Sequence, residues 1–209
     1  MFESTGLYRQ STVRQLDPVS GDVLVSVPLG NEYFGEGLTY VDGKLVQITW
    51  KEATAFVWNA SNLTIPPTKY SYNTTKNNEG WGITYNKNKH ELIVSDGSAN
   101  LIFWDPDTLE TLRTLKVTRQ SGKPALNINE LEFWRGRVLA NVWYEDVLLV
   151  IHPKTGLVEK EYDFSSLWPK ETRPSGTDVL NGISVTDDPD ILYVTGKLWN
   201  RMYRIKLLP

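Results

Sequence analysis

Hydrophobic and polar residues alternate in short runs along the chain, and clusters of Gly, Pro, Asn and Asp separate the runs. Segments 54–59 and 138–143 are examples of such runs. Short runs bounded by turn residues are typical of β-strands, and no segment shows a convincing helical period of 3.6 residues. The pattern predicts an all-β protein, with one helical turn at 164–171.

Four segments repeat one order of residues, in which a marked residue is followed by a small or polar residue, by Leu or Ile, and by two short strands. The marked residues are Glu36, Trp81, Asn129 and Asn181, at intervals of 45, 48 and 52 residues. Such intervals are typical of the four-stranded blades of a β-propeller. The second strand of each unit ends at a further marked residue: Trp50, Asp96, Trp143 or Lys197.

The two marked residues of one unit are expected at the same edge of its sheet. In an antiparallel hairpin, the start of the first strand and the end of the second strand are neighbours. Third strands are expected at 54–59, 100–106, 147–153 and 201–209, and fourth strands at 68–73, 111–117 and 157–164. The N-terminal segments 1–8, 11–21 and 22–29 fit the second, third and fourth strands of a further unit.

The chain is therefore predicted to form a single domain over residues 1–209, a five-bladed β-propeller. The first blade lacks its inner strand, and the last blade lacks its outer strand. Inner strands of a propeller line its central channel, so the marked residues of successive blades are expected to meet at one mouth of that channel.

This mouth is predicted to be a small pocket with aromatic walls. Glu36 stands between Gly35 and Gly37, which leave its carboxylate open to close approach. Indoles around one acid, one amine and two amides are a composition typical of small-molecule sites. The residues expected at this mouth are Glu36, Trp50, Trp81, Asp96, Asn129, Trp143, Asn181 and Lys197. The remaining indoles are expected to pack the blades: Trp58, Trp104, Trp134, Trp168 and Trp199.

Composition excludes several classes of partner. The net charge is −3 with a pI of about 5.5, and no basic run is present, which disfavours nucleic acid and anionic membranes. No apolar run approaches the ~20 residues that span a bilayer, and nothing after Met1 has the form of a signal peptide. A monomer is expected. Three sequons, at Asn59, Asn62 and Asn73, permit a secretory route and glycosylation without predicting a compartment.

Several motifs, taken in order, resemble those of one family. They are FESTGLY, YFGEGLT, EGWGIT, SDGS, NELE, AN.W, VLNGI and VTGKLW, and they extend from Met1 to Leu208. Together they resemble the plant and bacterial type of glutaminyl cyclase, the glutaminyl-peptide cyclotransferases that are five-bladed propellers. Family members usually begin with a segment containing Phe-Thr-Gln-Gly-Leu, whose Gln and Phe enter the site, and this chain starts after it.

The resemblance implies a function and a role for each marked residue. The expected reaction converts the N-terminal Gln of peptides and proteins to pyroglutamate with release of ammonia, without a metal or cofactor. Glu36 is implied as the catalytic acid and base. Asn129 and Lys197 are implied to contact the reacting group, and the indoles to wall the pocket: Trp50, Trp81 and Trp143.

The chemistry is consistent with a single carboxylate. The amine of an N-terminal Gln attacks its own side-chain amide, so the substrate itself supplies much of the proximity. A carboxylate can take a proton from the attacking amine and return it to the departing ammonia. Donors such as Lys197 and Asn129 can stabilise charge on the amide oxygen.

Structural interpretations compete with these roles. Lys197 can be a solvated strand end, and Asn129 or Asn181 can cap turns; we favour function for the first two and structure for Asn181. Asp96 is expected to form a turn. His90 and His152 fall in hairpin turns and are expected to be neither a general base nor ligands of zinc.

Two alternatives to an active enzyme stay open at the level of sequence. One is a non-catalytic propeller that binds peptides or small ligands at the channel mouth. The other is an incomplete gene product whose open ring folds poorly or associates through its free edge.

Overall fold

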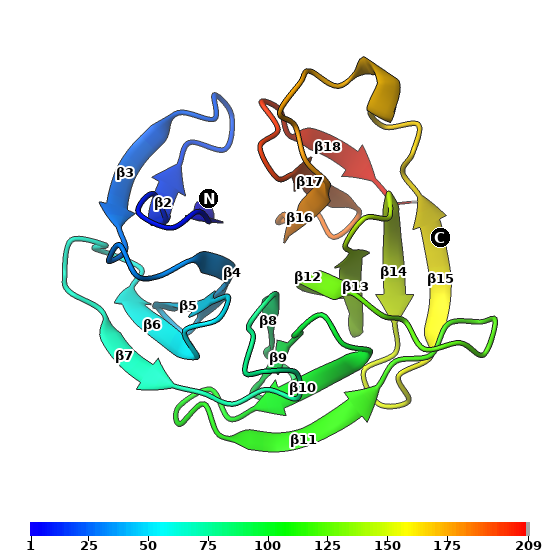
Figure 1. Cartoon of the computed structure of the whole chain (residues 1–209), viewed down its shortest axis with the longest axis horizontal. Helices are drawn as coiled ribbons and strands as arrows, with labels where there is room; N and C mark the ends of the chain where they lie inside the picture. Colours follow the sequence, from blue (N-terminus) through cyan, green and yellow to red (C-terminus); the bar gives the residue numbers. More distant parts are fainter. Residues whose placement is uncertain (208–209) are drawn as a thin grey trace. The chain divides into compact units, whose positions relative to one another are not determined.

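The computed structural model describes residues 1–207, and its strands form five antiparallel sheets in which consecutive strands pair (Figure 1). The sheets are β1 (Phe2–Thr5), β2 (Thr12–Leu16) and β3 (Val23–Pro28); β4 (Gly35–Val41), β5 (Lys44–Thr49), β6 (Thr54–Asn59) and β7 (Thr68–Ser71); β8 (Ile83–Asn86), β9 (Glu91–Val94), β10 (Asn100–Trp104) and β11 (Thr111–Lys116); β12 (Ile128–Trp134), β13 (Arg137–Val142), β14 (Val147–Ile151) and β15 (Val158–Asp163); and β16 (Leu180–Val185), β17 (Ile191–Gly196) and β18 (Tyr203–Lys206).

The strands confirm the all-β prediction and the repeat from which it was built. Each predicted third and fourth strand overlaps a strand of the structure, from β6 and β7 to β18. Residues 208 and 209, included in the predicted last strand, lie outside the described residues. The predicted helical turn at 164–171 corresponds to a turn followed by a short 3₁₀ segment, η1 (Lys170–Thr172). No helix within residues 1–207 has the length and apolar character needed to cross a membrane.

The Cα positions divide the chain into two compact units. The first comprises Met1–Asp96 and Ile102–Arg113, and the second comprises Gly97–Leu101 and the described residues from Thr114 onward. We describe each unit by itself. In the first unit β4 lies against β1 and β8, and in the second unit β16 lies against β12 and β13. Neighbouring sheets within a unit therefore meet mainly through their first strands.

Two apolar clusters hold the sheets of the first unit together. Val13, Leu45 and Phe56 belong to the cluster between the sheets β1–β3 and β4–β7. Ile48 and Trp104 belong to the next cluster, with residues of β8 and β9. Alternation along each strand sends its apolar side chains to these layers. Trp58 and Trp104 are buried in the two clusters, as predicted for packing residues.

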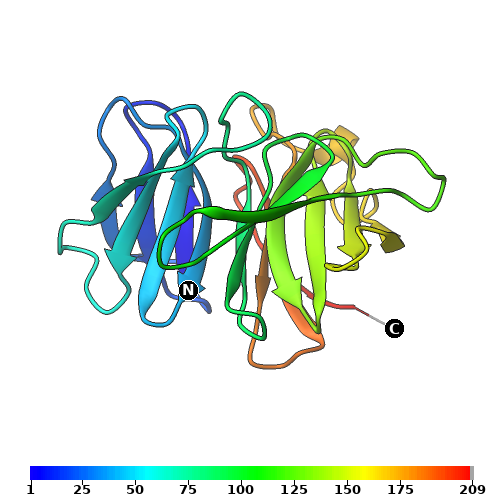
Figure 2. The same ribbon diagram turned by 90° about the horizontal axis from the view of Figure 1, so that it is seen from below.

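The second unit has a corresponding apolar cluster between its sheets. Leu139 and Leu148 of one sheet pack with Ile183 and Leu192 of the other, and Trp134 covers the cluster at its margin. Trp168 is also buried and meets Trp199 edge to face, with ring centroids 4.9 Å apart. Consecutive strands from β12 to β15 pair antiparallel, and Figure 2 shows this part of the chain in green to yellow.

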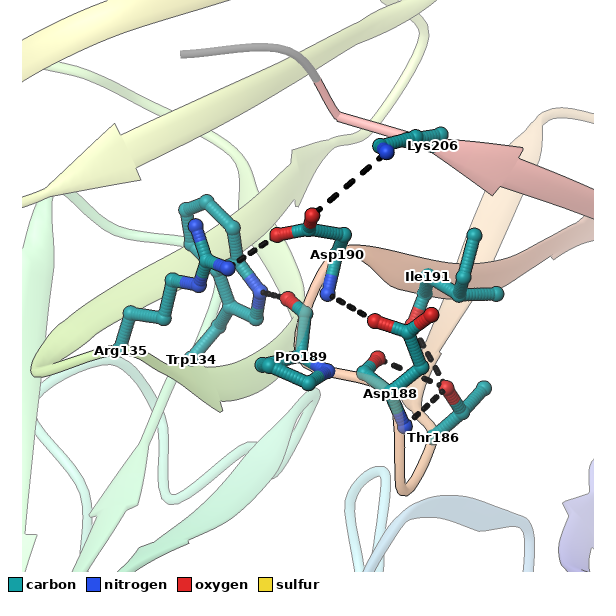
Figure 3. Close-up of polar contacts among 8 residues, drawn as sticks. All are labelled: Trp134, Arg135, Thr186, Asp188, Pro189, Asp190, Ile191 and Lys206. Carbon is teal, nitrogen blue, oxygen red and sulfur yellow. Dashed lines mark hydrogen bonds and ion pairs between the residues drawn. The ribbon is translucent and has the colours of Figure 1, made fainter.

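A polar clasp at the hairpin turns also joins the two sheets of the second unit (Figure 3). Arg135, in the β12–β13 turn, pairs with the carboxylate of Asp190, which follows β16, and Lys206 of β18 lies 3.6 Å from the other carboxylate oxygen. Trp134 donates its indole N–H to the carbonyl of Pro189 at 2.7 Å. The carboxylate of Asp190 thus links the β16–β17 turn to the β12–β13 turn and to the end of β18.

The hairpin turns follow local sequence chemistry. Asp42 and Gly43 form a two-residue loop between β4 and β5, with φ values of 46° and 87°. Two positive φ values define the turn that matches the twist of a hairpin, and Asp-Gly is a preferred pair for it. His152 accepts backbone N–H bonds from Lys154 and Thr155 through Nδ1. This histidine therefore caps its own turn, in line with its predicted structural role.

Candidate active site

The first marked residues occupy a β-bulge at the start of each first strand. Gly35 pairs with Thr49 but Leu38 pairs with Gln47, so Glu36 and Gly37 together oppose one residue of β5. The same two-against-one arrangement holds Asn129 with Glu130 in β12, and Asn181 with Gly182 in β16. A bulge re-aims a side chain and is frequent beside functional sites.

Trp81 is held in an equivalent way, one step before β8. Its N–H donates to the carbonyl of Ser95, and the N–H of Ser95 donates to the carbonyl of Gly82. Trp81 and Gly82 therefore oppose the single residue Ser95. Glu36, Trp81, Asn129 and Asn181 thus each occupy the same kind of two-against-one bulge in their own hairpin.

The strand registers confirm that both marked residues of a unit lie at one edge of its sheet. Gly35, just before Glu36, pairs with Thr49, just before Trp50. The other hairpins repeat this relation: Ile128 pairs with Val142, and Leu180 pairs with Gly196. Asn129 and Trp143 therefore share the end of one hairpin, and Asn181 and Lys197 share the end of the next.

Glu36 is half-buried in the first unit, at the point where β4 meets β8. The N–H of Gly37 donates to the carbonyl of Trp81 at 2.9 Å, which fixes the Glu36 bulge beside Trp81. Burial raises the pKa of the nearby Tyr72, and the charges of Glu52 and Glu36 raise it further. The carboxylate of Glu36 is therefore close enough to act electrostatically on a buried phenol.

The two predicted indoles of the first unit are brought together by one carboxylate. Trp50 and Trp81 both donate their indole N–H to Oε2 of Glu79, at 3.0 and 2.9 Å. Phe34 meets Trp50 edge to face, with ring centroids 5.6 Å apart, and Tyr8 meets Phe34 at 5.4 Å. The sequence analysis did not find Phe34, Tyr8 or Glu79, although Phe34 and Glu79 stand two residues before Glu36 and Trp81 in the quoted motifs.

Asp96 is fully buried, and its carboxylate reaches a different loop of the first unit. Its Oδ2 accepts the N–H and the hydroxyl of Thr75, at 2.8 and 2.6 Å, and the N–H of Lys76 at 2.8 Å. The sequence interpretation of Asp96 as a turn residue does not include this contact. Asp96 therefore anchors the β7–β8 connection that carries Glu79 and Trp81.

In the second unit, Asn129 and Trp143 lie at the end of the β12–β13 hairpin. Asn129 is buried and Trp143 is half-buried. The backbone N–H of Trp143 donates to the carbonyl of Asn127. Tyr144 stacks on Trp143, with ring centroids 4.2 Å apart, and is 64% exposed at a φ of 70°. Turn positions with this φ favour Gly or Asn, so Tyr144 occupies a backbone conformation that is uncommon for its residue type.

Lys197 directly follows β17, and its backbone is hydrogen-bonded through both its N–H and its carbonyl. Its N–H donates to the carbonyl of Val179, and its carbonyl accepts the N–H of Asp178. Leu198, the next residue, has a φ of 59° and is 64% exposed. Lys197 is half-buried, and these two backbone hydrogen bonds fix the place from which its side chain leaves the end of the hairpin.

Glu130 is a second acidic residue at the Asn129 bulge that the sequence analysis did not single out. Its carboxyl accepts the N–H of Ile183, and Glu132 accepts the N–H of Val185 at 3.0 Å. Burial raises the pKa of Glu130 well above its ordinary value, and the charge of Glu132 adds to this. The two residues tie the edge of β16 to β12.

Among residues 1–207, no three His, Cys, Asp or Glu side chains are arranged to hold a metal ion. Of the predicted site residues, Glu36, Trp50 and Trp81 belong to the first unit, and Asn129, Trp143 and Lys197 belong to the second.

Comparison with known proteins places these residues in a family. The sequence profile described as glutamine cyclotransferase matches residues 1–207. The chain belongs to the glutamine cyclotransferase family. A curated relative, the glutaminyl-peptide cyclotransferase of Arabidopsis thaliana, is 37% identical over 99% of the chain. The chain spans 63% of the length of that relative.

Solved structures show the fold of the family. The crystal structure of Myxococcus xanthus glutaminyl cyclase matches with a TM-score of 0.81 and 34% identity, covering 97% of this chain and 84% of that one. Kuenenia stuttgartiensis hydrazine synthase shares the fold alone, with a TM-score of 0.53 and 12% identity over 88% of this chain and 49% of its own.

The predicted fold class, a five-bladed β-propeller, is confirmed by the match to the Myxococcus glutaminyl cyclase and by the five antiparallel sheets. Within residues 1–207, the sheets β1–β3 and β16–β18 have three strands each, as predicted for the first and last blades. The organisation of residues 1–209 as a single domain stays a prediction.

Proposed function

We propose that this protein converts the N-terminal Gln of peptides and proteins to pyroglutamate. The family match over residues 1–207 carries the proposal, together with the names of the Arabidopsis and Myxococcus relatives. Presentation of Glu36 on a glycine-flanked bulge supports it, because a bulge holds a side chain in a defined direction. The family match does not favour a non-catalytic binding protein.

In the proposed reaction the neutral α-amine of Gln attacks its own side-chain amide carbon. A C–N bond forms in the five-membered ring, and the bond to the amide nitrogen breaks to release ammonia. Glu36 accepts the proton from the attacking amine and gives it to the leaving nitrogen, so no net proton is consumed. The reaction as written uses neither water nor a cofactor.

The remaining predicted residues are proposed to bind and to stabilise. Asn129 and Lys197 donate to the amide oxygen as negative charge develops on it. Trp50, Trp81 and Trp143 form apolar walls that hold the folded rotamer of the Gln side chain. Peptides and proteins with an N-terminal Gln are the proposed substrates.

The test is ammonia release from a peptide that begins with Gln. Glu36→Gln is expected to lower kcat about a hundredfold or more, because an amide cannot relay the proton. Lys197→Met and Asn129→Ala are each expected to lower kcat about a hundredfold, through loss of a donor.

Two controls accompany this assay. Glu32→Gln changes an exposed carboxylate of the same segment and is expected to retain activity. The N-acetylated peptide has no free amine and is expected to release no ammonia. Turnover by Glu36→Gln at the wild-type rate would contradict the role of Glu36.

A further inference from the structure

Two indoles of the first unit share one hydrogen-bond acceptor. We propose that Glu79 is a positioning residue that fixes the orientation of Trp50 and Trp81 through Oε2, at 3.0 and 2.9 Å from their indole nitrogens. The inference rests on the proposed function, because it assigns these indoles to the wall of the Gln pocket. It adds a residue to which the sequence analysis gave no role.

The shared oxygen restrains both rings in one geometry. An indole N–H can only donate, and a buried one usually finds an acceptor within the protein; Trp81 is buried and Trp50 is half-buried. A carboxylate oxygen has two lone-pair directions and can accept both N–H groups, and bonds to a charged acceptor are the stronger kind. Rotation of either ring out of this arrangement breaks its bond to Glu79.

Other contacts restrain the rings less specifically. The ammonium of Lys51 lies 3.8 Å from the ring centroid of Trp50, and that of Lys76 lies 5.2 Å from the ring centroid of Trp81. Both contacts are made by flexible side chains over a ring face, so they leave the edge of each indole undefined. Glu79 alone, among the contacts described for residues 1–207, binds the N–H edge of both rings.

The loop that carries Glu79 is itself well anchored. The carbonyl of Glu79 accepts the hydroxyl of Thr74, and its N–H donates to the carbonyl of Lys76. The buried carboxylate of Asp96 holds the preceding residues, as described above. The next residue, Gly80, donates to the carbonyl of Trp50, and a Cβ there would lie 2.3 Å from the hydroxyl of Tyr72. The position of Glu79 is therefore fixed from both sides.

Glu79 acts on the substrate through the indoles and not by contact with the reacting atoms. Its removal is expected to loosen the pocket wall for substrate and transition state alike. Such a change raises KM and leaves kcat less affected. A conservative Glu79→Gln variant retains an oxygen acceptor in the same place and is expected to rescue the effect.

The experiment combines indole NMR with kinetics on the full chain. In ¹H–¹⁵N spectra, assigned with Trp50→Phe and Trp81→Phe, both indole N–H signals of the wild type are expected to exchange slowly with solvent. In Glu79→Ala both signals are expected to exchange faster, and KM for a Gln-initiated peptide to rise about tenfold, as for loss of charged hydrogen bonds. Glu79→Gln is expected to retain slow exchange and a KM near that of the wild type.

Matched variants make the result decisive. Glu110→Ala removes an exposed carboxylate of the same unit and is expected to change neither measurement. Glu79→Met keeps the side-chain volume without an acceptor, and it replaces Glu79→Ala if that variant does not fold. An active wild type with unchanged indole exchange or unchanged KM in the variant would overturn the role of Glu79. A wild type without turnover contradicts the proposed function itself.

Discussion

The bulge in β4 and the bulge in β12 have the same backbone pairing but attach the next first strand differently. In β4 the second bulge residue is Gly37, which packs directly on the backbone of Gly82 and Ile83. In β12 it is Glu130, whose carboxyl accepts the N–H of Ile183. The side chain of the first bulge residue is thus available for a functional role, while the second bulge residue makes the contact with the neighbouring sheet.

The comparison is most sharply tested at Gly37. A Cβ there would lie 2.7 Å from the nitrogen of Ile83 and 2.9 Å from Gly82, and backbone atoms cannot move aside as a side chain can. Gly37→Ala is therefore expected to lower the free energy of unfolding by about 2–3 kcal/mol, the usual cost of overpacking. Urea denaturation measures this change.

Gly21→Ala is the control for that substitution. Gly21 has a φ of 79°, and a Cβ at this position would have no neighbouring atom within 4 Å, so only the backbone conformation opposes Ala there. The expected cost is about 1 kcal/mol. Equal destabilisation by Gly37→Ala and Gly21→Ala would contradict the close backbone contact.

The β12 bulge is expected to respond to loss of its side chain. Glu130→Ala removes the acceptor of the Ile183 N–H and leaves a buried donor without a partner. The expected loss is about 1–2 kcal/mol in the free energy of unfolding, measured with urea. Glu130→Gln retains an acceptor oxygen, so at a pH near 4.5 it is expected to stay close to the wild type. A Gln variant as unstable as the Ala variant would argue against the hydrogen bond.

A smaller effect is expected in the pH dependence of stability. Burial raises the folded pKa of Glu130 above its ordinary value of 4.5. The folded chain then holds a proton that the unfolded chain has already released, so this contribution is complete below pH 4.5 and is lost as the pH rises through the folded pKa. Glu130→Gln has no such loss. Its free energy of unfolding, relative to the wild type, should rise from pH 4.5 upward; a constant difference would contradict the raised pKa.

Much of the fold could be predicted from local pattern. Strands such as β6 and β14 follow from short apolar runs between turn residues, and the hairpin ends follow from the spacing of the marked residues. The roles proposed for Glu36 and Lys197 came from the resemblance to the family's motifs. These features depend on residues that are close in sequence or that repeat at a fixed interval.

The contacts that organise the site could not be predicted in this way. Glu79 binds Trp50 across 29 residues, and Asp96 binds Thr75 across 21 residues. No periodic signal marks such pairs, because each depends on where two loops lie in space. The glycines beside Glu36 suggested an unusual backbone, but the Asn129 bulge contains no glycine and carried no such signal.

The bulges also shift the pairing register within their strands by one residue. Along a regular strand, each residue removed or added moves every later side chain to the opposite face. The extra residue at Glu36, Asn129 and Asn181 lets a polar group leave the alternation while Leu38, Leu131 and Ile183 keep their inward orientation. The bulges of this chain therefore carry Glu36, Asn129 and Asn181 at the same position, while the apolar alternation of the strand that follows is unchanged.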